Sequence, residues 1–92
     1  MKQIQSVQIW DNGTVQTGTF LNAYIIYDNL FDTANFYWAI WSSDAEGKAV
    51  ISLAEGNLTI NDPEYDVWGQ SADINQAAYE WIANKLNLTL IP

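Results

Sequence analysis

The 92-residue chain contains no cysteine and no histidine. Without cysteine there can be no disulfide, no thiolate nucleophile and no cysteine-ligated zinc or iron–sulfur site. Without histidine the chain lacks the most common general base and the most common transition-metal ligand. Catalysis could therefore rest only on aspartate, glutamate, tyrosine, lysine or serine. We expect a protein that is not an enzyme and that has no cofactor and no metal ion.

Positive charge is also scarce. Arginine is missing, and the three basic residues are Lys2, Lys48 and Lys85. Against 11 acidic residues they leave a net charge of −8, which repels a phosphate backbone. We therefore expect no direct contact with nucleic acid.

Long apolar runs are missing as well. No stretch reaches the roughly 18 apolar residues of a membrane-spanning helix, and residues 1–6 lack the basic and apolar regions of a secretion signal. We expect no membrane contact. The expected location is a cytosol, or a particle that is assembled there.

What the chain does contain is typical of a folded protein, with 49% hydrophobic and 14% aromatic residues. Its length suits one domain, residues 1–92. Strand-forming residues recur in four runs, which are 3–10, 14–27, 33–42 and 49–60. Asn12-Gly13 lies between the first two runs and is a strong hairpin signal. Because every connection is short, neighbouring strands should pair antiparallel.

Glycine and asparagine inside the long strands suggest irregularities. We expect a break or bulge near Gly18 or Asn22, and another at Glu55-Gly56. Residues 61–70 are predicted to be irregular, because a proline and a glycine bracket acidic and aromatic residues.

The end of the chain has helical periodicity. Ser71 is a candidate N-cap for a helix from about Ala72 to Leu86. The expected apolar side of this helix consists of Ile74, Ala77, Ala78, Trp81 and Ile82. Residues 88–92 read as a short final strand or an apolar tail. The predicted fold class is α+β, an antiparallel meander of four or five strands with one C-terminal amphipathic helix on one face.

The third strand is apolar on both sides. Alternation puts Phe36, Trp38 and Ile40 on one face, and Tyr37, Ala39 and Trp41 on the other. One helix can cover only one face, so either the sheet curls on itself or another molecule covers the second face. Aromatic residues are enriched at interface centres, which favours a protein partner. The predicted interface residues are Tyr24, Ile26, Tyr37, Trp41 and Trp68.

Other candidate sites are weaker. Asp62, Glu64, Asp66 and Asp73 have the spacing of a calcium-binding loop, but position 6 of the frame is Val67 where glycine is required. Paired carboxylates could cleave glycosidic bonds, but Asp44 and Glu46 stand in a polar loop without a desolvating pocket. These acids read as solvated surface groups.

Two alternative functions remain open at this point. The five tryptophans could stack on sugars, and Trp41 and Trp68 are the candidates for exposed rings in a carbohydrate-binding module. The acidic charge would also suit an inhibitor or nucleic-acid mimic that binds a basic host protein. A mimic needs carboxylates spaced like phosphates, whereas these acids cluster in three loops.

Several segments carry a resemblance to a known class of proteins. They are Asn35-Phe36-Tyr37-Trp38, Glu55-Gly56-Asn57-Leu58-Thr59-Ile60, Tyr79-Glu80-Trp81 and Leu86-Asn87-Leu88-Thr89. With these segments the chain resembles small accessory proteins of tailed bacteriophages. The resemblance implies a virion component that works by assembly, as a homo-oligomer or within a larger particle, or by binding a host protein.

Overall fold

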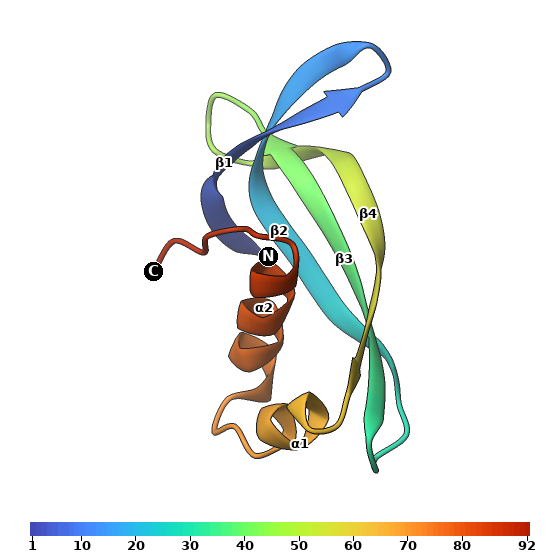
Figure 1. The fold of residues 1–92 in the computed structure, drawn as a ribbon. Helices are drawn as coiled ribbons and strands as arrows, with labels where there is room; N and C mark the ends of the chain where they lie inside the picture. Colours follow the sequence, from blue (N-terminus) through green and yellow to red (C-terminus); the bar gives the residue numbers. More distant parts are fainter.

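The computed structural model describes all residues from Met1 to Pro92. Its main element is a four-stranded antiparallel sheet in the order β1-β2-β3-β4 (Figure 1). The strands are β1 (Lys2–Asp11), β2 (Thr14–Asp28), β3 (Thr33–Ser43) and β4 (Ala49–Asn61). The α+β class, the four strands and their meander order are therefore confirmed.

The first hairpin follows from its turn residues. Asn12 and Gly13 have φ angles of 49° and 87°, and Asp11 pairs with Thr14 directly across the turn. Two positive φ values in a two-residue loop match the twist of the flanking strands, and asparagine and glycine tolerate them best. The predicted Asn-Gly hairpin is confirmed.

Register shifts interrupt the sheet at several places, and the first lies near Gly18, as expected, although its extra residues are in β1 opposite Gly18 and Phe20. In β1 the register shifts between Gln3 and Val7, and in β2 between Ile25 and Tyr27. β4 shifts twice opposite residues 40–43 of β3. Extra residues of this kind increase local twist and bend the strand.

The bulge expected at Glu55-Gly56 is wrong, because both residues pair regularly with β3. Gly56 lies opposite Trp38, and the indole ring occupies the space where a side chain would stand. A Cβ at position 56 would come within 2.9 Å of Cζ2 of Trp38. The glycine thus provides close packing for an aromatic ring, which is a second reason for glycine in a strand.

Two helices follow the sheet, α1 (Glu64–Gly69) and α2 (Ile74–Lys85), where the sequence predicted one. The prediction of an irregular segment at residues 61–70 is therefore wrong, because most of it forms α1. Acidic residues in the first turn of α1 favour its helical dipole, and Trp68 on its inner side is buried.

The second helix begins two residues later than expected. Asp73, in place of Ser71, is its N-cap, and the carboxylate accepts the backbone N–H of Gln76 at 3.0 Å. Its buried residues are Ala78, Tyr79, Ile82 and Ala83. Ile74, expected on the apolar side, is 47% exposed.

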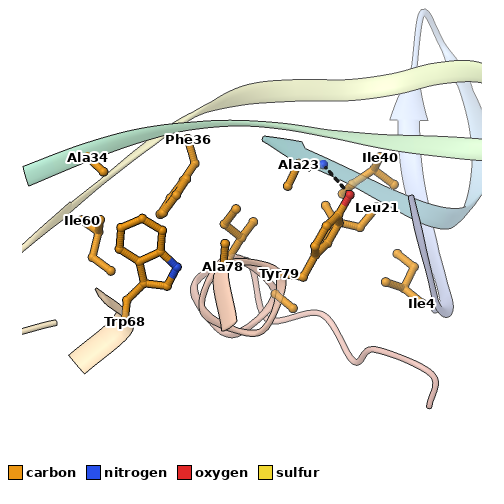
Figure 2. Close-up of a cluster of buried hydrophobic side chains, with 12 residues drawn as sticks. Ile4, Leu21, Ala23, Ala34, Phe36, Ile40, Ile60, Trp68, Ala78 and Tyr79 are labelled. Atoms are coloured by element: carbon orange, nitrogen blue, oxygen red, sulfur yellow. Dashed lines mark hydrogen bonds between the residues drawn. The ribbon is translucent and has the colours of Figure 1, made fainter. Parts of the chain in front are cut away.

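The buried side of α2 is thus rotated about the helix axis from the expected side, towards Tyr79. Its hydroxyl oxygen accepts the backbone N–H of Ala23 at 3.1 Å, in the part of β2 that extends beyond β1 (Figure 2). The ring therefore fills the core while its polar atom satisfies a buried strand donor.

The core lies between the sheet and the two helices (Figure 2). Phe36 of β3 is at its centre, with its ring centroid 5.3 Å from that of Trp68 and 5.7 Å from that of Trp81. Its fully buried large side chains are Ile4, Leu21, Phe36, Ile60 and Ile82.

The end of the chain closes one edge of the sheet. The backbone N–H of Gln5 donates to Thr89, and that of Ile91 donates to Gln3, each at 2.9 Å. Leu90 forms a single bridge with Ile4 rather than a full strand. The outer side of β1 is thus partly covered, whereas β4 remains a free edge.

The contact between Gly56 and Trp38 generates a stability prediction. We expect Gly56→Ala to lower the free energy of unfolding by about 1–3 kcal/mol, because the new methyl group overlaps an indole that core packing holds in place. Urea unfolding followed by circular dichroism measures this loss.

Gly69→Ala is the matched control, since no atom lies within 4 Å of a Cβ at that position. It should leave stability unchanged or raise it by up to about 1 kcal/mol, as alanine is the better helix former. Equal effects of the two substitutions would contradict the packing role of Gly56.

Candidate functional site

Both helices lie on the same side of the sheet, so the opposite side has no second layer (Figure 1). We call this side the open face. Alternation and register place on it Phe20, Asn22, Tyr24, Tyr27, Thr33, Asn35, Tyr37, Ala39, Trp41, Glu55, Asn57, Thr59 and Asn61. These residues come from the three neighbouring strands β2, β3 and β4.

Two tyrosines form the aromatic centre of the open face. Tyr24 and Tyr37 pair across β2 and β3, with ring centroids 4.9 Å apart and planes tilted by 33°. Tyr24 is 55% exposed, and Tyr37 is half-buried beneath it. Such a cross-strand aromatic pair fixes both rings, so little rotamer freedom remains to be lost when a partner binds.

Tyr37 is also held by the neighbouring strand. Its hydroxyl donates a hydrogen bond to a carboxylate oxygen of Glu55 at 2.6 Å. This hydrogen bond, helped by desolvation and the negative charge, raises the pKa of Tyr37 to about 12. The phenol therefore stays neutral over the whole physiological range and holds Glu55 in a fixed position.

Polar pairs border the aromatic centre. The hydroxyl of Thr59 donates to Asn35 at 2.5 Å, and that of Thr33 donates to Asn61 at 3.0 Å. Hydrogen-bonded polar groups around an aromatic centre are typical of protein interfaces.

The open face is not uniformly exposed. Ala39 is fully buried and Trp41 is half-buried, although no helix lies over them. The indole N–H of Trp41 is buried and has no hydrogen-bond partner. This half of the face is therefore less accessible, and the half that carries Tyr24 and Tyr27 remains open.

The predicted interface residues separate into two groups. Tyr24 and Ile26 are 55% and 54% exposed, and Tyr37 and Trp41 are half-buried beside them. The assignment of Trp68 to this interface is corrected, because Trp68 is only 6% exposed and packs against Phe36 on the helix side of the sheet. Its indole N–H donates to the carbonyl of Ile74 at 2.9 Å, which fixes the ring there.

Sequence reasoning missed Tyr27, which is 56% exposed and pairs with Asn35 of the open face. Strict alternation from Tyr24 assigns Tyr27 to the covered side. The extra residue Ile26 changes the alternation, so that Tyr27 returns to the open side. An isoleucine pair flanked by tyrosines gives no signal of a bulge.

The acids of the calcium-like frame do not converge. No group of three or more acidic residues is placed to hold a metal ion. Glu64 accepts the indole N–H of Trp81, Asp66 accepts the side-chain amide of Gln70, and Asp73 caps α2. Each of these carboxylates has a local structural partner.

A groove of about 350 Å³ lies between the two helices. Its walls are Pro63, Glu64, Val67, Trp68, Ser71, Ala77 and Trp81. Trp81 donates to Glu64 at 2.7 Å, and Lys85 lies 3.5 Å from the same oxygen. The indole hydrogen bond lowers the pKa of Glu64, and the charge of Lys85 acts in the same direction.

Comparison of the chain with protein-family models, curated proteins and solved structures gives no match. Neither helix has the length and the apolar character that crossing a membrane requires. The open face and the groove are therefore interpreted from their own chemistry.

The link between Tyr37 and Glu55 can be tested by titration. Because the pKa of Tyr37 is raised above its usual value of 10.0, its hydrogen bond contributes stability below pH 10 and loses that contribution as the pH rises through about 12. In Glu55→Gln the acceptor is uncharged, so the pKa of Tyr37 should move back towards 10. NMR titration of ring-labelled tyrosine measures both values.

Tyr65 supplies the control for this titration. Its hydroxyl donates to Asp28 at 2.7 Å, and its pKa is raised to about 12 chiefly by that hydrogen bond. It should not respond to Glu55→Gln. A pKa of Tyr37 that is the same in wild type and variant would refute the assignment.

Proposed function

We propose that this protein is a non-enzymatic structural or assembly protein, of the type found in tailed bacteriophages, that acts through protein–protein contacts on the open face. The observation that carries the proposal is the exposed aromatic half of that face. Tyr24 and Tyr27 are each more than half exposed on a layer that no helix covers. Aromatic side chains in this state are typical centres of protein interfaces.

The geometry of the tyrosines supports this role. Tyr24 rests on Tyr37, and Tyr37 is fixed by Glu55, so the exposed ring is held before any partner arrives. A rigid aromatic surface binds with a small loss of conformational entropy. Tyrosine also offers both an apolar ring and a hydroxyl group to a partner.

A second copy of the chain is the partner that the charges favour. Although the net charge is −8, Glu55 is the only charged residue among those that define the open face. Two open faces can therefore approach without placing many like charges in contact. A two-fold dimer would bring each Tyr24 and Tyr27 against the same patch of its partner.

The two alternative functions have less support in the contacts. Of the two candidate rings, Trp68 is buried and Trp41 is half-buried, so neither offers a free face to a sugar. Trp10 is 73% exposed but stands apart at the first hairpin. For an acidic mimic, the carboxylates of Asp28, Asp44 and Asp73 are held by backbone N–H groups in three separate connections of the chain, and not side by side along one element.

Replacement of the two exposed tyrosines tests the proposal. We expect the wild type to self-associate at micromolar concentration. The double variant Tyr24→Thr/Tyr27→Thr should raise the dissociation constant at least about 30-fold, since each interface aromatic contributes more than about 1 kcal/mol. Threonine preserves strand preference. Light scattering and sedimentation velocity measure the association.

Trp10→Thr is the matched control, because it removes another exposed aromatic from a strand outside the open face. It should leave the association unchanged. A wild-type chain that is strictly monomeric and also fails to bind phage-particle proteins would contradict the proposal. Association that weakens steeply with salt would favour the acidic inhibitor, and altered tryptophan fluorescence with glycans would favour the carbohydrate-binding module.

A further inference from the structure

The strand β4 forms one edge of the sheet and has a neighbouring strand on only one side (Figure 1). Its register with β3 is unbroken from Ala54, opposite Ile40, to Asn61, opposite Thr33. None of the backbone hydrogen bonds outside the helices and strands involves residues 54–61, whereas such bonds do occupy the outer side of β1. Residues 54–61 are therefore a regular edge to which a further strand can be added.

Hydrogen bonds elsewhere in the sheet determine which backbone groups of β4 face outward. The carbonyl of Thr33 accepts the N–H of Asn29, which follows β2, so the backbone of Thr33 points away from β4. The opposite residue, Asn61, then points away from β3, because opposed residues of an antiparallel pair either bond to each other or both face away. This direction alternates along a strand, so the N–H and C=O groups of Glu55, Asn57 and Thr59 face outward as well.

A second hydrogen bond gives the same assignment from the other side of the sheet. The N–H of Ala23 donates to the hydroxyl of Tyr79, so Ala23 and the opposite Trp38 do not bond to each other. Trp38 therefore bonds to Gly56, which lies opposite it in β4. With Gly56 directed inward, the odd-numbered residues from 55 to 61 carry the free groups of the edge.

This edge lacks the features by which natural sheets usually prevent strand addition. Residues 54–61 contain no lysine, no proline and no register shift. Their only charged residue is Glu55, whose carboxylate already accepts the hydroxyl of Tyr37. A shallow hollow of about 390 Å³ adjoins the start of this stretch, and its walls, residues 52–55, all belong to β4. No other element reaches over the edge there.

The side chains of the edge suit a second copy of the same strand. Asn57, Thr59 and Asn61 are exposed, and each carries an amide or a hydroxyl that can both donate and accept a hydrogen bond. A set of this kind is complementary to itself about a two-fold axis. A basic strand would find one carboxylate along residues 54–61, and an acidic strand would find no cation. The edge therefore favours an uncharged strand such as its own copy.

The direction of the backbone groups also selects the register of such a pair. Outward residues must oppose outward residues, so a two-fold axis near the middle of the stretch passes through Asn57 or Leu58. With the axis at Leu58, Glu55 opposes Asn61, and Asn57 opposes Thr59. Every outward residue of the regular stretch is then paired, whereas an axis at Asn57 leaves Asn61 without a partner inside that stretch.

We propose that β4 of one copy pairs antiparallel with β4 of a second copy, about a two-fold axis at Leu58, and joins the two sheets into one. The two Glu55 carboxylates then stand about 20 Å apart along the strands, beyond the screening length of about 8 Å. Since β4 has one free edge, the contact closes at two copies. It differs from the open-face contact and does not depend on it.

Amide hydrogen exchange of the wild-type chain, followed by NMR, tests the pairing directly. At low protein concentration the outward N–H groups of Glu55, Asn57 and Thr59 should exchange rapidly. At concentrations where sedimentation velocity shows dimers, their exchange should slow at least about tenfold. The N–H groups of Gly56 and Leu58, which bond to β3, should be protected at both concentrations. A contact made by side chains alone does not produce this alternation.

Replacement of Asn57 supplies the second test. Asn57→Pro removes an outward N–H from both copies and leaves the bonds to β3 in place. It should keep the wild-type circular dichroism spectrum and raise the dissociation constant of the pair at least about tenfold, as measured by sedimentation velocity.

Asn57→Ala is the matched control, because it removes the side chain and keeps the N–H. It should change the dissociation constant by less than about threefold. Both variants are made in the Tyr24→Thr/Tyr27→Thr background, in which the open-face contact is weakened.

Three results would overturn the proposal. They are exchange at the three outward N–H groups that does not slow while the chain associates, equal weakening by proline and alanine at position 57, and protection that appears only with a phage-particle protein. The last result would assign the edge to a strand of that protein. If Asn57→Pro does not fold, the exchange pattern of the wild type decides.

The same measurements separate this contact from the open face. Association that is lost in the tyrosine variant, with no protection of the outward N–H groups in wild type, would reject the β4 pair and retain the open face. Wild-type association of the tyrosine variant, together with the alternating protection, would support the β4 pair and reject the open face.

Discussion

The contact of Phe36 with Trp68 and Trp81 joins the sheet to both helices, and the remaining architecture depends on it. One ring on β3 meets an indole from α1 and an indole from α2. With both helices committed to this side, the chain has no further element to cover the other side of the sheet. The exposed tyrosines of the open face are thus a consequence of where the core was placed.

Local signals explain why the sheet was predictable. Alternating apolar residues and the Asn12-Gly13 turn depend on neighbours in sequence, and all four strands lie close to their expected bounds. α1 was missed because the six residues Glu64–Gly69 are too few to show a helical period. The rotation of α2 could not be predicted, since Tyr79 satisfies the N–H of Ala23, a residue 56 positions away.

The candidate site was predictable where alternation is regular. Tyr24 and Tyr37 share a face because the register between them is unbroken. Tyr27 was missed because a bulge depends on the twist of the whole sheet, and Trp68 was misplaced because its helix was not recognised. The turn between β2 and β3 has a readable turn sequence, but the sequence alone does not tell whether its Leu30 and Phe31 fold inward or outward, and in the structure both are exposed.

The two edges of the sheet differ in whether a further strand can be added to them. Backbone hydrogen bonds to Thr89 and from Ile91 occupy the outer side of β1, and two register shifts disturb one end of β4. Irregular or occupied edges resist uncontrolled strand addition. The outer side of β1 is therefore closed to a further strand, whereas β4 pairs regularly from Ala54 to Asn61 and keeps its outer backbone groups free along that length.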